Sequence, residues 1–128
     1  TDILAMRQRM RLELDRSAGV RFDLKQGRGG LVDMEFFLQS RVLAMANSNQ
    51  NVLSAQRSPD IIAVLKAIGD INDADANVLS AHYGNLIAHS MVCSLDQRPR
   101  IIDMTDELQN QCMKTLDIYA AKGMEYKT

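Results

Sequence analysis

Residues 22–39 read FDLKQGRGGLVDMEFFLQ. The segment around 20–24 alternates apolar and polar residues and favours an extended conformation, whereas the glycines that follow interrupt regular structure. From Leu31 onward, apolar residues recur at helical spacing and predict a helix to about residue 46. The stretch therefore predicts a basic, glycine-rich turn leading into a helix. Three roles for that turn remain open at this point: a phosphate cradle, a metal site, or simply the start of the helix.

An amphipathic helix is predicted upstream, over residues 2–16. Its apolar stripe recurs at helical intervals and comprises Ile3, Met6, Met10 and Leu14. This stripe leaves Arg7 and Arg11 on another face, where we expect the arginines to be solvated rather than to form a binding patch.

Three more helices are predicted after residue 57. Ser58-Pro59-Asp60 supplies an N-cap, a proline and a first-turn acid, and predicts a helix to about Gly69. Asp73 is expected to cap a long helix through Leu95, and Thr105 or Asp103 a last helix. The apolar stripe of the last helix is Leu108, Cys112, Leu116 and Tyr119. Five helices without a convincing sheet predict an all-α bundle that forms a single domain over residues 1–128.

Composition and charge narrow the classes of function. The 128 residues are 46% hydrophobic and carry a formal net charge of −1, which argues against a dedicated nucleic-acid or membrane-surface protein. No apolar run approaches the roughly 20 residues of a membrane span, and we expect a cytoplasmic protein. Cys93 and Cys112 lie in apolar helical patterns without metal-ligand spacing, so we expect both thiols to be buried and reduced.

The glycine loop is the first candidate site. Lys25, Arg28 and backbone N–H groups of the loop, next to a helix N-terminus, can in principle hold an anion. The alternative, which the spacing favours, is a tight turn in which Gly30 is the N-cap of the helix.

Acidic residues and histidines give weaker candidates. Asp33 falls at the third helical position, where a carboxylate stabilises the helix, and Glu35 shares a face with Gln39, where both are expected to hold a neighbouring element. The pair Asp73 and Asp75 is read as helix capping. His82 and His89, without a third ligand, are expected to be core or interface residues, and no metal site is predicted.

A family resemblance rests on two segments, MRQRM at 6–10 and the stretch at 22–39. Together they resemble the junction after the second nucleotidyltransferase domain of the glutamine synthetase adenylyltransferases. The resemblance implies the C-terminal helical domain of a bifunctional enzyme of nitrogen metabolism. One nucleotidyltransferase domain of that family attaches AMP from ATP to a tyrosine of glutamine synthetase, and another removes it by phosphorolysis. Glutamine and the PII signal protein act as regulators.

The same resemblance implies that catalysis lies elsewhere in the parent enzyme. The paired aspartates that bind magnesium in that family have no match here, so we expect this segment to have no catalytic residues, to bind neither ATP nor magnesium alone, and to be inactive in isolation. Residues 1–30 are the expected junction to an upstream nucleotidyltransferase domain.

Six residues match the junction pattern of the family: Lys25, Gly29, Gly30, Asp33, Glu35 and Gln39. We expect this surface to face the adenylylating domain. Lys25 and the glycine turn would orient that domain or approach the nucleotide phosphates. Asp33 and Glu35 would pair with basic side chains across the contact. Arg28 and Ile87 depart from the family pattern.

Two other classes of function remain open. One is a free-standing helical interaction module whose cationic first helix docks on an acidic partner. The other is a small nucleotide- or anion-binding protein that uses the glycine loop by itself.

Overall fold

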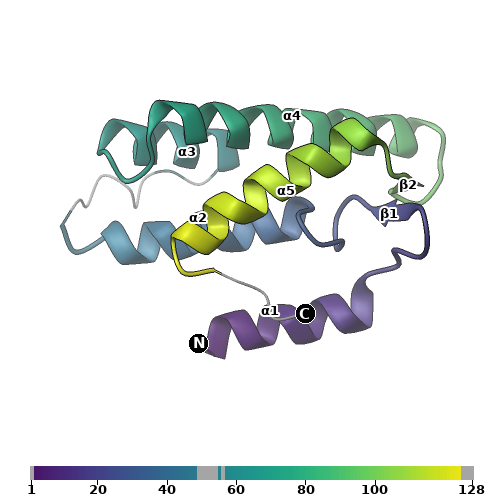
Figure 1. Ribbon diagram of the computed structural model, residues 1–128, viewed down its shortest axis with the longest axis horizontal. Helices are drawn as coiled ribbons and strands as arrows, with labels where there is room; N and C mark the ends of the chain where they lie inside the picture. The colour runs from purple at the N-terminus through teal and green to yellow at the C-terminus, as the bar shows by residue number, and fades with distance from the viewer. Residues whose placement is uncertain (1, 49–54, 56, 125–128) are drawn as a thin grey trace.

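The computed structural model describes residues 2–48, 55 and 57–124, with the side chains of residues 2 and 3 left out (Figure 1). In these residues the chain forms five helices and two short strands. In chain order they are α1 (Asp2–Leu14), β1 (Arg21–Asp23), α2 (Leu31–Met45), α3 (Ser58–Ala67), α4 (Asp73–Leu95), β2 (Ile101–Asp103) and α5 (Asp106–Ala121). The prediction of an all-α bundle is confirmed. The small sheet, in which β1 pairs antiparallel with β2, was not predicted.

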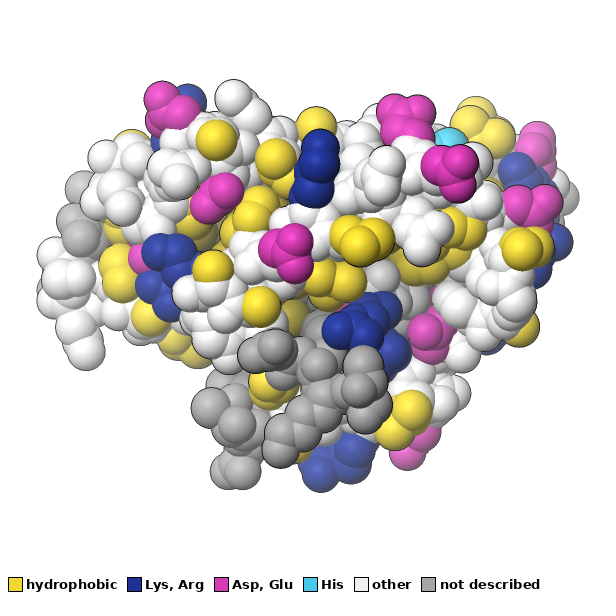
Figure 2. All heavy atoms as spheres, in the orientation of Figure 1, with side chains coloured by type: hydrophobic (Ala, Val, Ile, Leu, Met, Phe, Trp, Pro, Cys, Tyr) yellow, Lys and Arg dark blue, Asp and Glu magenta, His cyan; other side chains and the backbone are white. Residues whose placement is uncertain are grey.

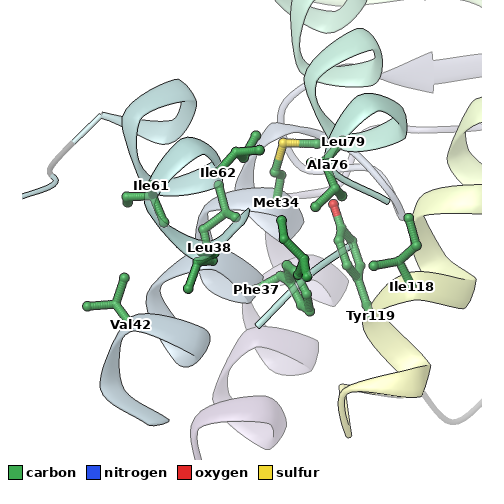
Figure 3. Close-up of a cluster of buried hydrophobic side chains, with 12 residues drawn as sticks. Met34, Phe37, Leu38, Val42, Ile61, Ile62, Ala76, Leu79, Ile118 and Tyr119 are labelled. Atoms are coloured by element: carbon green, nitrogen blue, oxygen red, sulfur yellow. The ribbon is translucent and has the colours of Figure 1, made fainter. Parts of the chain in front are cut away.

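The main core lies between α2, α3, α4 and α5. Its buried side chains are Met34, Phe37, Leu38, Val42, Ile61, Ile62, Leu65, Ile71, Ala76, Leu79, Ile118 and Tyr119. Figure 3 shows Phe37 of α2 beside Tyr119 of α5, and their rings stack with centroids 4.5 Å apart. Burial of these apolar side chains is the main force that holds α5 against α2.

A second core lies beneath the small sheet and supports the glycine-rich turn. It comprises Phe22, Leu24, Leu31, Leu86, Cys93, Leu108 and Cys112. Phe22 on β1 pairs with Ile102 on β2, so the segment before the turn is fixed against the segment before α5. The turn is therefore built on packed elements.

The helix starts agree with the sequence prediction to within one residue. Of the two caps predicted for α5, Thr105 and Asp103, the structure has Thr105, whose hydroxyl accepts the N–H of Leu108 at 3.1 Å. The cap of α4 is Asn72 rather than Asp73, and the cap position of α3 is Arg57 rather than Ser58. Asn72 is the N-cap because its side-chain oxygen accepts the N–H of Asp75 at 2.8 Å, which satisfies one of the free donors of the first turn.

The amphipathic prediction for α1 is wrong. Figure 1 shows this helix along one edge of the molecule, apart from the other four. Met6 and Leu14 of its apolar stripe are 43% and 48% exposed, whereas Arg7 is fully buried. The described members of the stripe, Met6, Met10 and Leu14, belong to neither core cluster, because α1 approaches the bundle through the face that carries Arg7. No helix in the described part of the chain is long and apolar enough to span a bilayer.

Candidate functional site

Asp23, at the end of β1, organises the loop that follows. Its side chain is 1% exposed, and its carboxylate accepts backbone N–H groups of Arg16 at 3.1 Å and of Lys25 and Gln26 at 3.0 Å. The Asp23 N–H in turn donates to Ser17 Oγ at 2.9 Å. No role for Asp23 was predicted from the sequence. An aspartate that is followed by a turn is nevertheless the usual signal for such side-chain to backbone bonds.

The glycine-rich turn uses its own N–H groups inside the chain. Gly27 donates to the Asp23 carbonyl at 2.8 Å, Gly30 to the Gly27 carbonyl at 2.8 Å, and Gly29 to Asp33 Oδ2 at 2.7 Å. These donors are therefore not directed at a common external anion. The structure favours the tight-turn alternative over the phosphate cradle, with Gly30 as the predicted N-cap of α2.

Two of the matched residues must be glycine. Gly29 has φ +84°, and a Cβ there would lie 3.1 Å from Cys112 Cβ. A Cβ at Gly30 would lie 2.7 Å from the Leu24 carbonyl oxygen. Left-handed backbone and close packing against α5 together explain why the turn needs residues without a side chain.

A buried ion pair joins α1 to the start of α2. Arg7 Nε donates to Asp33 Oδ1 at 2.7 Å, and neither side chain is exposed. The remaining guanidinium nitrogens donate to the Gln26 side-chain and main-chain oxygens at 3.2 and 3.1 Å, and the guanidinium carbon lies 5.9 Å from the centre of the Phe36 ring. The carboxylate of Asp33 is thus engaged by Arg7 and Gly29 within this chain. This corrects both the expected solvation of Arg7 and the expected pairing of Asp33 with a base of another domain.

His82 and Cys112 complete the buried side of the site. His82 Nε2 donates to the Gly29 carbonyl at 2.7 Å, and Cys112 Sγ lies 3.9 Å from both that oxygen and His82 Nε2. Burial lowers the pKa of His82, against the opposing effects of its hydrogen bonds with Gly29 and Gln111. Burial also raises the pKa of Cys112 to about 12, and the charge of Asp33 adds to this. A neutral imidazole and a protonated thiol are suited to structure rather than to nucleophilic chemistry.

The prediction that Cys93, Cys112 and His82 are buried is confirmed. Cys93 and Cys112 are both free and buried. His82 is a core residue, whereas His89 on the same helix is exposed. Asp73 is 85% exposed in the first turn of α4. In the ranges that the structure covers, no group of three or more histidine, cysteine or acidic side chains is placed to hold a metal ion.

The other three matched residues face outward. Lys25, Glu35 and Gln39 are exposed, in contrast to buried Gly29, Gly30 and Asp33. As predicted, Glu35 and Gln39 share one face of α2. Together they line two shallow pockets of about 350 and 360 Å³, one beside Tyr83 of α4 and the other beside Met6 of α1. Lys25 lies elsewhere, in a larger hollow of about 580 Å³ next to the end of α1.

The six residues therefore do not form one site. Gly29, Gly30 and Asp33 belong to a buried polar cluster, together with Arg7 and His82, that fixes three segments of the chain to one another. The exposed three lie on separate surfaces around that cluster. The arrangement is a rigid frame with two outward-facing surfaces.

Comparison with known proteins shows similarity over most of the chain. Residues 2–119 match the model of a family described as GlnD PII-uridylyltransferase. A bifunctional glutamine synthetase adenylyltransferase/adenylyl-removing enzyme from Stenotrophomonas maltophilia K279a is 42% identical over 111 residues, which are 87% of this chain and 12% of that protein. The enzyme of the same name from Xanthomonas campestris pv. campestris B100 is 37% identical over 126 residues, 98% of this chain and 13% of that protein. That from Nitrosococcus oceani is 41% identical over 87 residues, 68% of this chain and 8% of that protein.

These matches confirm the family resemblance seen in residues 22–39 and extend it over most of the chain. The chain spans about an eighth of the length of the first two relatives. The similarity therefore concerns one segment of much longer proteins.

Proposed function

Because the chain belongs to the GlnD PII-uridylyltransferase family and is similar to bifunctional glutamine synthetase adenylyltransferase/adenylyl-removing enzymes, we propose that it is the C-terminal helical domain of such an enzyme. Its role is structural and regulatory. It completes a cytoplasmic enzyme that attaches AMP to a tyrosine of glutamine synthetase and removes it again, in the control of nitrogen metabolism. ATP and magnesium belong to the nucleotidyltransferase domain that precedes it, and glutamine synthetase and PII are partners of the whole enzyme.

The buried Arg7 to Asp33 pair is the observation that carries this role. It ties α1, which does not share the main core, to the glycine-rich turn and the start of α2. Its partners Gln26 and Gly29 sit in the same turn, so the angle between α1 and the bundle is fixed by several directed hydrogen bonds. A fixed connection of this kind suits a segment that holds one domain against another.

The exposed residues of the family pattern offer two separate surfaces to the adenylylating domain. Glu35 and Gln39 flank shallow pockets, and Lys25 stands on the other side of the turn. We assign these three side chains to the domain contact. Lys25 orients the nucleotidyltransferase domain, and Glu35 pairs with a basic side chain of that domain. Asp33 acts indirectly, by holding the turn.

The test is a chimera in the Stenotrophomonas maltophilia enzyme, whose matching segment is replaced by this chain. Adenylylation of purified glutamine synthetase is followed with radiolabelled ATP, and removal of AMP with inorganic phosphate. We expect the chimera to be active, and both the enzyme without the segment and this chain alone to be inactive for adenylylation. Full activity without the segment would contradict the proposed role.

Variants within the chimera separate the contact surface from folding. We expect Lys25→Ala and Glu35→Ala to lower adenylylation about tenfold while the melting temperature stays within about 2 °C, because exposed side chains contribute little to stability. Lys114→Ala is the matched control, because Lys114 is an exposed basic residue on α5. If activity falls only in proportion to stability, the surface has no role beyond folding.

A free-standing helical interaction module remains the alternative. The first helix is less suited to docking on an acidic partner than the sequence indicated, because Arg7 is buried and paired with Asp33. An inactive chimera, combined with binding of the isolated chain to an acidic protein, would favour this alternative.

A further inference from the structure

Four cationic side chains from three separate segments line the hollow that contains Lys25. They are Arg16 after α1, Lys25 after β1, and Arg98 and Arg100 in the loop between α4 and β2. The hollow has a volume of about 580 Å³ and also contains Glu13 and Asp23. On the face drawn in Figure 2, basic and acidic side chains both lie at the end of the molecule that carries the strands. We call this feature the basic hollow.

The backbone around the basic hollow is fixed before any ligand arrives. The N–H of Leu24 donates to the Arg100 carbonyl at 2.8 Å, which joins the loop after β1 to the loop before β2. The N–H of Arg98 donates to the Cys93 carbonyl at 3.0 Å, and the N–H groups of Arg16 and Lys25 converge on the Asp23 carboxylate. The backbone at or next to all four cations is therefore held by hydrogen bonds, some local and some between segments, so a ligand need not order the backbone.

The charge in the basic hollow is only partly compensated by the chain. Asp23 is 1% exposed, and its oxygens accept three backbone N–H groups, so this acid of the lining is largely withdrawn from solvent. Arg16 Nε lies 3.8 Å from Asp23, and Arg98 Nε 3.3 Å from Asp96, with both arginines well exposed. The pair of Arg98 with Asp96 lies at the surface, and the Arg16 contact is long with its guanidinium exposed, so both pairs are weak and readily exchange partners.

Lys25 and Arg100 are the two most available cations. In the part of the chain that the structure describes, neither side chain forms a hydrogen bond or an ion pair. Glu13, on the α1 side, is then the one acid of the lining that is not already engaged by backbone donors. The excess of basic over acidic side chains in the lining favours an anion that carries more than one negative charge.

We propose that the basic hollow binds an oligophosphate, either free or carried by a nucleotide. A phosphate group presents several acceptor oxygens and more than one negative charge, so a short chain of such groups can meet cations that approach from three segments. A single carboxylate carries one negative charge, and so offsets less of the positive charge of the four cations than an oligophosphate does. This site is distinct from the glycine-rich turn, whose N–H groups are used internally. Lys25 also belongs to the proposed domain contact, but binding of an oligophosphate by this chain alone does not depend on its role in adenylylation.

Titration of the isotopically labelled chain with inorganic triphosphate, without magnesium, tests the proposal. We expect saturable changes in the amide signals of residues 16, 24–26 and 98–100. We also expect the affinity to fall as salt is raised. Saturation at other residues, or no saturation, would overturn the assignment.

Variants test which side chains bind. The double variant Lys25→Ala and Arg100→Ala should lose at least tenfold in affinity for triphosphate, whereas Lys25→Arg with Arg100→Lys should retain it. Lys114→Ala with Arg57→Ala removes two exposed bases outside the basic hollow and is the matched control. Equal losses in the two alanine pairs would reduce the effect to net charge and contradict a defined site.

Further ligands distinguish the sources of the phosphate. ATP that binds as tightly as triphosphate supports recognition of the phosphates alone, and tighter binding supports a nucleotide. Adenosine should not bind, and binding by adenosine at the same amides would contradict the proposal. A hexaglutamate peptide that binds more tightly than triphosphate would overturn it in favour of an acidic protein segment.

Discussion

Arg7 Nε and Asp33 Oδ1 lie 2.7 Å apart, although 26 residues separate them in the sequence and neither side chain reaches solvent. The pair connects a helix outside the main core to the first turn of α2. The carboxylate also accepts the N–H of Gly29 and occupies the first turn of a helix, where the backbone favours a negative charge. One side chain thus stabilises the helix start, the glycine-rich turn and the position of α1.

Replacing Arg7 by methionine should destabilise the protein by about 3 kcal/mol, because removing one partner of a buried ion pair leaves the other charge without compensation. Urea unfolding at pH 7 measures this change. Arg9→Met, an exposed arginine of the same helix, is the control and should change stability by about 0.5 kcal/mol or less. Similar losses in the two variants would show that the buried pair contributes nothing specific.

Gly29→Ala should destabilise the protein by about 2 kcal/mol or more. Alanine at this position would have to adopt the left-handed backbone of Gly29, and its Cβ would lie 3.1 Å from Cys112 Cβ. Gly84→Ala is the opposite case, because Gly84 lies inside α4 with open space around it, and alanine there should stabilise by about 0.5–1 kcal/mol. Thermal unfolding of both variants checks the difference. The same sign of change in both would contradict the geometry of the turn.

The thiol of Cys112 should be unreactive in the folded protein. Burial raises its pKa to about 12, so at pH 8 the reactive thiolate is scarce as well as inaccessible. Alkylation with iodoacetamide, followed by peptide mass spectrometry, is expected to label Cys112 only after unfolding in guanidinium. Labelling in the native state at the rate of a free thiol would contradict the buried arrangement with His82 and Gly29.

The sequence was sufficient for the elements that depend on local pattern. Helical spacing and caps placed α2 to α5 within a few residues, since propensity and burial agree there. The sequence did not predict the inward direction of Arg7, because that depends on a partner 26 positions away. The exposure of Met6 and Leu14 on α1 has the same origin. An amphipathic pattern gives two faces, and only the packing of the whole chain decides which one is covered.

The candidate site was predictable in part. Spacing alone indicated the glycine turn and the place of Asp33 in the first turn of α2, and the family pattern added to this; their burial follows from distances that no sequence pattern contains. Asp23 was overlooked, although its position before a turn is a recognisable signal. The basic hollow could not be predicted, because Arg98 and Arg100 meet Lys25 only through the pairing of β1 with β2.

Protonation of His82 should weaken the fold below about pH 6.5. Burial holds its folded-state pKa below the ordinary value of 6.5, so the unfolded chain binds the proton more readily as the pH falls through that value. Stability is therefore fully present above about pH 7 and is lost progressively at lower pH. The loss is at most about 1.4 kcal/mol for each pH unit until the folded-state pKa is reached. Urea unfolding measured from pH 7.5 to 5 gives this slope.

His82→Gln should flatten the pH dependence, because glutamine can still donate to the Gly29 carbonyl but does not titrate. The variant is expected to be less stable than the parent at pH 7.5 and to lose less stability by pH 5. His89→Gln is the matched control, since His89 is the other histidine of α4 and is exposed, and its slope should equal that of the parent. If the slope is unchanged in His82→Gln, or reduced as much in His89→Gln, the buried imidazole is not the group that links stability to pH.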